Sequence, residues 1–253
     1  NLNYYNPAAG FNTAETRRAL TLYGKVKSVD SPVWDKPMTF LANYLGRLKG
    51  DAGFYSASLL RDNYSFFNRT GLSVGYTRQY AVFNTRTLSV GGRAIFNFDR
   101  MNWGEAPQFG QTGSATRVTP DLDLGVQYEG KRLRVGLAVK NLVGSTAKLD
   151  GATLLKNQRE AYLNASYVLL RRENFSLAPY ALVQFNRDFG VDGGLYFSLY
   201  RRLNLSYQFQ LSELRSVFTA EANLTKNLHV GLAVGPSRLY RDRDFDVLVG
   251  LNF

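Results

Sequence analysis

Acidic and basic side chains recur at every second position in several segments of this chain, a spacing that could support the handling of ions. The six that stand out are Arg93, Asp121, Asp123, Arg134, Lys140 and Glu221. Side chains at alternate positions of a β-strand share one face, so these groups would gather on one side of a sheet. They would form either an ion pathway or a salt-bridge network in which each buried charge is offset by a partner. We favour the network.

Residues suited to acid–base or nucleophilic catalysis are scarce. The chain has one histidine, His229, and no cysteine, so it offers neither a disulfide framework nor a thiolate metal site. Hydrolytic enzymes that use a histidine usually place it beside a serine or an aspartate. The simplest role for His229, which stands between the apolar residues Leu228 and Val230, is a hydrogen bond to a neighbouring residue. We therefore expect no enzymatic activity, no metal site and no cofactor.

Strands, rather than helices, must position these charges. No apolar run approaches the ~18 residues that a membrane helix needs, and the last eleven residues alternate, with Leu248 the one large apolar residue on the face of Asp246, Gly250 and Asn252. Their apolar face consists of Phe245, Val247, Val249, Leu251 and Phe253. Such a strand, small or polar on its other face and ending on Phe, is typical of the strand that closes a bacterial outer-membrane β-barrel. The edge strand of a soluble β protein is the alternative, because periodicity alone does not separate the two.

Alternating segments of this kind recur along the whole chain. We predict strands at about 17–27, 36–46, 52–61, 69–81, 85–98, 119–129, 131–142, 158–170, 174–187, 190–201, 203–214, 217–226, 227–236 and 243–253. Six connections are short and alternate with others that include two long ones, at about 99–118 and 142–157, which is the loop pattern of outer-membrane barrels. The prediction is thus an all-β, transmembrane antiparallel barrel of about 14 strands, with 12 as the alternative and both termini in the periplasm.

The chain reads as one domain over residues 1–253. Residues 1–16 do not alternate, and we expect them to form a periplasmic or lumen-lining segment. Because the chain starts at Asn1, we interpret it as a mature form from which a signal peptide has been removed. The net charge of +11 would also suit nucleic-acid binding, but the basic residues fall mainly at turns and form no helical stripe, so we expect no nucleic-acid partner.

Two sets of residues are candidates for contacts with partners. A basic periplasmic rim would contain Arg47, Lys49, Arg78, Arg86, Lys131, Arg132, Arg171, Arg172, Arg201, Arg202 and Lys226. It would bind lipid phosphates or an acidic periplasmic protein. The outer loops would contribute Trp34, Trp103, Phe109, Arg238, Tyr240, Arg241 and Arg243. Aromatic residues interleaved with Arg suit a protein interface as well as an aromatic girdle at the membrane surface.

Several stretches carry a resemblance to a known family. They are the opening Asn6-Pro7-Ala8-Ala9-Gly10, the strand Leu20–Lys27 followed by Trp34, and the hairpin joining Pro120–Tyr128 to Leu133–Leu142. In these the chain resembles the PorP/SprF family of the Bacteroidetes type IX secretion and gliding-motility apparatus. The motif residues in this chain are Asn6, Pro7, Ala8 and Gly10. The resemblance implies an outer-membrane barrel without known catalytic residues.

The resemblance also implies protein partners. Some family members hold a secreted adhesin at the cell surface, and others belong to the secretion apparatus. Our leading hypothesis is therefore a non-enzymatic barrel that anchors or scaffolds a secreted surface protein or other subunits of an outer-membrane complex. The alternative is an outer-membrane diffusion channel whose basic lumen would favour anions.

Overall fold

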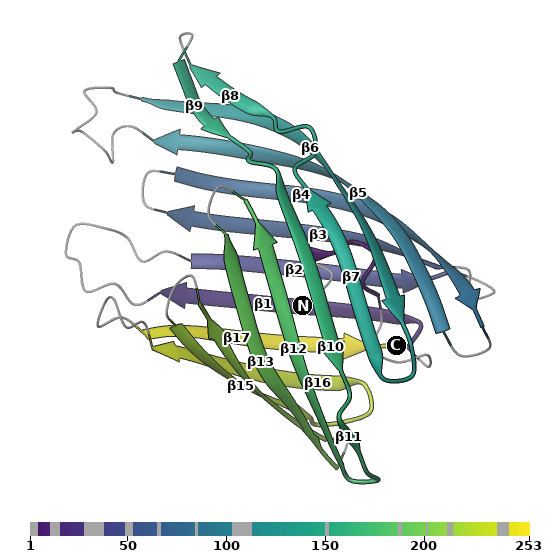
Figure 1. The fold of residues 1–253 in the computed structure, drawn as a ribbon. Coiled ribbons are helices and arrows are strands. Elements are labelled where there is room, and N and C mark those ends of the chain that lie inside the picture. The colour runs from purple at the N-terminus through teal and green to yellow at the C-terminus, as the bar shows by residue number, and fades with distance from the viewer. Residues whose placement is uncertain are drawn as a thin grey trace.

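The alternating segments form a closed ring of antiparallel strands in the computed structural model (Figure 1). The structure describes residues 5–10, 16–27, 38–48, 53–64, 67–83, 86–102, 113–149, 152–186, 189–200, 202–211, 215–236 and 243–253. None of the described segments forms a helix long and apolar enough to cross a membrane.

The strands of the ring follow one another in chain order. They are β1 (Arg18–Lys27), β2 (Met38–Arg47), β3 (Gly53–Tyr64), β4 (Phe67–Val82), β5 (Arg86–Asn102), β6 (Ser114–Glu129), β7 (Leu133–Lys140), β10 (Glu160–Tyr167), β12 (Phe175–Phe185), β13 (Gly190–Leu199), β14 (Leu203–Gln210), β15 (Arg215–Asn223), β16 (Leu228–Pro236) and β17 (Arg243–Asn252). Outside this ring, β11 (Leu170–Arg171) pairs with β12, and β8 (Thr146–Leu149) pairs with β9 (Ala152–Lys156). The prediction of a 14-stranded antiparallel barrel is confirmed.

The two ends of the chain close the ring. β1 pairs with β17 from Ala19 opposite Asn252 to Lys27 opposite Asp244. Arg18 and Phe253 then exchange two backbone hydrogen bonds of 2.9 Å. Closure leaves no free sheet edge between the first and last strands, which is what a sheet in lipid requires.

Alternation places apolar side chains outside and polar ones inside. On β17, Phe245, Val247 and Leu251 are exposed, whereas Gly250 between them is buried. On β6, Leu122, Leu124 and Val126 are exposed, while Asp121, Asp123 and Gln127 are at most 5% exposed. The core of this molecule is therefore the largely polar interior of the barrel, in which a few apolar residues such as Phe54 and Met101 are also buried, while most large apolar residues face outward.

Short connections, the start of β1 and the C-terminal Phe253 lie at one end of the barrel, which we call the turn end. Arg47, Val82, Glu129 and Leu199 end their strands there, beside Arg18 and Phe253. We call the opposite end the loop end.

Two details at the loop end differ from the sequence prediction. β5 continues to Asn102 and β6 begins at Ser114, so much of the predicted loop 99–118 is strand. The predicted loop 142–157 contains the β8–β9 hairpin, which Figure 1 shows extending beyond the ring next to β6. The two strands of a hairpin pair backbone N–H and C=O groups with each other, so the hairpin can form without joining the barrel wall.

Candidate functional site

The N-terminal segment Tyr5–Gly10 lies against the inner wall. Asn6 and Ala8 are 1% exposed. The side-chain amide of Asn6 donates to the backbone oxygen of Val126, at 3.1 Å, and to the side-chain oxygen of Gln127, at 3.2 Å. Its side-chain oxygen accepts a hydrogen bond from Ala8 N at 2.9 Å, and its backbone oxygen accepts one from Ala9 N at 3.0 Å. Asn6 thus both folds the turn and fastens it to β6.

Two glycines make room for this turn. A methyl group on Gly91 of β5 would lie 3.1 Å from Ala8 N, and one on Gly125 of β6 would lie 3.0 Å from Pro7 Cδ. The two glycines are directly opposite each other in the ladder. Thr77 of β4 then donates from its hydroxyl to Pro7 O at 2.9 Å. The wall is therefore shaped to accept a close backbone, which is a recognised use of glycine in strands.

Each residue of the opening motif has a contact that accounts for it. Asn6 supplies the amide, Pro7 and Ala8 pack on the glycine pair, and a methyl group on Gly10 would lie 2.5 Å from the ring of Phe54. The assignment of the whole segment 1–16 as a periplasmic or lumen-lining segment stays a prediction.

Buried ion pairs continue the same wall toward the loop end. Arg93 of β5 donates to the carboxylate of Asp123 at 2.6 Å, and their side chains are 5% and 0% exposed. Arg69 of β4 makes a two-pronged pair with Asp99 at 2.6 and 3.2 Å. Thr119 also donates to Asp99 at 3.0 Å. Two-pronged, charge-assisted pairs of this kind hold both partners in one orientation.

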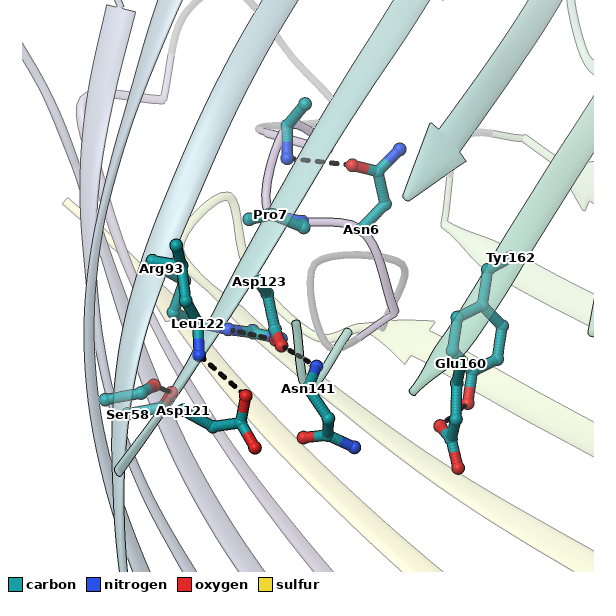
Figure 2. A network of polar contacts seen from close by, with 12 residues as sticks. Asn6, Pro7, Ser58, Arg93, Asp121, Leu122, Asp123, Asn141, Glu160 and Tyr162 are labelled. Atoms are coloured by element: carbon teal, nitrogen blue, oxygen red, sulfur yellow. Dashed lines mark hydrogen bonds and ion pairs between the residues drawn. The ribbon is translucent and has the colours of Figure 1, made fainter. Parts of the chain in front are cut away.

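The connection after β7 is fastened to this cluster. Asp123 accepts a hydrogen bond from Asn141 N at 3.0 Å, and Asp121 accepts one from Val143 N at 3.1 Å. Asn157, which follows β9, donates to Asp121 at 3.2 Å and accepts from Arg69 at 3.1 Å. Figure 2 shows Arg93, Asp121, Asp123 and Asn141 gathered in the same region as Asn6 and Pro7. The acids of β6 therefore connect the barrel wall to its longest described loop.

Lys140 lies where β7 faces β10. It is 8% exposed, and its ammonium nitrogen is 5.8 Å from the centre of the Tyr162 ring. The Tyr162 hydroxyl donates to Glu160. The centre of the Tyr5 ring is 5.3 Å from that of Tyr162, so this group connects the β7–β10 pair to the N-terminal segment.

The other predicted inner residues lie apart from this cluster. Arg134 pairs with Glu129 at 2.6 Å, where both side chains are about one-third exposed. Glu221 packs against Gly231, and His229 packs against Gly250. Sequence reasoning did not single out Arg69, Asp99, Asn157, Gln127 or Tyr162. Arg69 and Asp99 share the period-2 signal of the residues that it did single out.

The described inner face of the fourteen strands does not carry the chain's surplus of positive charge. Among the strand residues whose side chains the structure describes, strand register turns nine carboxylates inward: Asp62, Asp99, Asp121, Asp123, Glu129, Glu160, Asp192, Glu221 and Asp246. Eight cations accompany them: Lys25, Arg47, Arg69, Arg93, Arg117, Arg134, Lys140 and Arg215. This near balance differs from the expected basic lumen. Period-2 patterning shows which residues of one strand share a face. The net charge of the inner face can be added up only when every strand has been placed.

Predicted partner residues fall in two groups. Arg78, Arg86, Lys131, Arg132, Arg171, Arg172, Arg202 and Lys226 are exposed around the turn end. Arg47 is half-buried there, with its Nε 3.4 Å from Thr16 O. Lys49, Arg201, Trp34, Trp103, Phe109, Arg238, Tyr240 and Arg241 lie outside the described residues, as does the side chain of Arg243, with which β17 begins. Within the described part of the chain, no group of three or more His, Cys, Asp or Glu residues is arranged to hold a metal ion.

Solved structures with the same fold are outer-membrane barrels. The chain is similar to the outer membrane protein Omp33 of Acinetobacter baumannii, with 11% identity over 94% of this chain and 99% of that one, at a TM-score of 0.58. It is also similar to the toluene transporter TbuX of Ralstonia pickettii, with 12% identity, 99% and 92% coverage and a TM-score of 0.61. It is similar as well to the toluene transporter TodX of Pseudomonas putida, with 12% identity over 98% of this chain and 91% of that one, at a TM-score of 0.56. At these identities the likeness concerns the fold alone.

Comparison with protein families identifies the chain more closely. No curated protein matches it, but the family described as type IX secretion system membrane protein PorP/SprF matches residues 1–236. Together with the closed barrel, this confirms the resemblance carried by Asn6-Pro7-Ala8 and the Pro120–Leu142 hairpin. The chain is an outer-membrane β-barrel and belongs to the PorP/SprF family of type IX secretion system membrane proteins.

Proposed function

We propose that this barrel is a non-enzymatic scaffold that docks a secreted surface protein or other subunits of a type IX secretion-like complex. Its turn end, with both termini, faces the periplasm, and its loop end faces outward. The observation that carries the proposal is the inner wall from β4 to β7. There the N-terminal turn and the buried ion pairs occupy the interior, which suits a rigid support better than a wide conduit.

The loop end gains a fixed shape from the same wall. Asp121 and Asp123 each bind backbone N–H groups of the connection after β7, and Asn157 adds a contact from its far side. Fixing a loop before binding reduces the conformational entropy that association costs. A loop held in this way is suited to present a docking surface.

A diffusion channel is the second candidate. The observation that favours it is the opposite wall, where inward side chains of β13 to β15 such as Asp192, Ser206 and Thr219 are only partly buried. Water reaches this side of the interior. Because the inward charges of the strands nearly balance, these strands would give such a channel little preference for anions. The likeness to TbuX and TodX is one of fold, so it does not decide between the two candidates.

Recovery of the protein from its native outer membrane in mild detergent, followed by mass spectrometry, tests the proposal. We expect stoichiometric recovery of a secreted surface protein or of secretion subunits. An untagged strain treated identically is the control for non-specific recovery. Recovery of the bare barrel, together with large steady currents in a planar bilayer, would overturn the scaffold in favour of the channel.

A further inference from the structure

Strand β6 has neighbouring strands on both sides for only part of its length. On one side, β5 pairs with all of it, from Ser114 to Glu129. On the other side, β7 pairs with it only from Leu124 to Glu129. β8, which follows β7 in the chain and lies near β6, pairs with β9 instead. On this side, no described strand therefore pairs with β6 from Ser114 to Asp123.

The connection after β7 covers the nearer part of this uncovered stretch. Leu142 N donates to Leu122 O at 2.9 Å, and the hydroxyl of Ser145 donates to Pro120 O. Pro120 itself has no N–H to offer. The chain then pairs with itself in the β8–β9 hairpin, which Figure 1 shows leaving the ring. Among the described residues, the hydrogen bonds from this connection to the backbone of β6 therefore end at Pro120.

The five residues beyond Pro120, which are Ser114 to Val118, leave an open edge that we call the β6 edge. Neighbouring residues of an antiparallel strand turn their N–H and C=O groups to opposite sides. Because Leu122 O faces the β7 side, the backbone groups of Ser114, Thr116 and Val118 face it too. No described residue bonds to Val118 there, and Thr116 O accepts only from Arg117 of the same strand, at 3.2 Å.

The β6 edge lies mostly beyond the apolar band of the barrel. The last apolar pair on the outward faces of β5 and β6 is Phe98 opposite Val118. The next outward row is polar on four neighbouring strands and consists of Asn63, Asn68, Arg100 and Thr116. Unpaired backbone groups are not tolerated in lipid. Both observations place the open groups in water at the loop end.

We infer that the β6 edge binds an extended segment of a protein partner, which adds to the sheet as a further strand. The inference rests on the proposed scaffold function and assigns one of its contacts. N–H and C=O groups in a row at strand spacing are matched by another extended polypeptide. A lipid headgroup does not repeat donors and acceptors at that spacing. The edge also adjoins the connection that Asp121 and Asp123 hold in place, so a partner at the loop end meets both.

Substitution of Thr116 tests the backbone contact. Thr116→Pro removes the N–H that faces the open edge, while the bonds of β6 to β5 stay in place, because they come from the residues on either side. Thr116→Ala is the matched control, since it removes the same side chain and keeps the N–H. In recovery from the native outer membrane, we expect Thr116→Pro to lower the amount of partner about tenfold and Thr116→Ala to leave it unchanged. An unchanged unfolding midpoint checks that both variants fold.

Amide hydrogen exchange tests the edge in the unsubstituted protein. In the bare barrel, the N–H groups of Thr116 and Val118 should exchange faster than those of Arg117 and Thr119, which face β5. In the recovered complex, exchange at Thr116 and Val118 should slow at least tenfold. Slow exchange at both positions already in the bare barrel, as when β8 closes onto β6, would overturn the inference.

The outcomes separate the inference from the proposed function. Equal recovery of the partner with Thr116→Pro and Thr116→Ala would overturn strand addition at the β6 edge. Because the barrel would still hold its partner in that case, the scaffold function would stand. If the unsubstituted barrel is recovered bare, both fail.

Discussion

The two walls of the barrel interior are built from similar residues but differ in how far they are covered. Between β4 and β7, inward polar side chains such as Thr77, Asp123 and Gln127 are at most 1% exposed. Between β13 and β15, inward Ser206, Thr219 and Glu221 stay partly exposed. The difference comes from what lies on each wall. The N-terminal turn lies on the first wall, and charged side chains of that wall pair with one another. The residue types of the strands alone therefore do not determine whether a barrel interior is filled.

Removing one charge from each wall should give the largest difference. Asp123→Asn removes the carboxylate that pairs with the buried guanidinium of Arg93 at 2.6 Å, and we expect the free energy of unfolding to fall by about 3–5 kcal/mol. Glu221→Gln on the opposite wall should change it by about 0.5 kcal/mol or less, because water reaches that side chain. Urea unfolding of the two variants in the same detergent measures both. Equal losses would show that the walls do not differ in this way.

Filling the glycine pair should displace the N-terminal turn. A side chain in Gly125→Val would overlap Asn6 and Pro7, so residues 5–10 should become open to protease, with a loss of about 2–3 kcal/mol in unfolding free energy. Gly24→Val is the matched control, because a methyl group there has nothing within 4 Å. Limited proteolysis with N-terminal sequencing reads the outcome. Continued protection of residues 5–10 in Gly125→Val would contradict the packing of the N-terminal turn on the glycine pair.

Truncating one amide on each side should give a smaller difference. Asn6→Ala removes two hydrogen bonds to β6 and one of the two bonds that fold the turn, so we expect a loss of about 1–3 kcal/mol. Asn204→Ala, on the partly exposed wall, should cost about 0.5 kcal/mol or less. The same urea titration compares them. A larger loss for Asn204→Ala would reverse the order of the two walls.

The sequence was sufficient for the strands, the closing pair and the short turns, because period-2 patterning and turn residues are local signals. Arg93 and Asp123 were both identified as inner charges, and only strand register shows that they are directly opposite. Contacts such as Asn6 with Val126, or Arg69 with Asn157, join segments about a hundred residues apart. No local pattern encodes them, since they depend on how a segment outside the barrel strands lies against the inner wall.

Thiol reactivity tests the central contrast most directly, because the chain has no cysteine of its own. Thr77→Cys places a thiol beneath Pro7, and Thr219→Cys places one on the opposite wall. A small water-soluble thiol reagent should label position 219 rapidly and position 77 slowly. Removal of residues 1–10 should raise labelling at position 77 to the level of position 219. Equal labelling of both positions in the intact chain would contradict the filled wall on which the scaffold proposal rests.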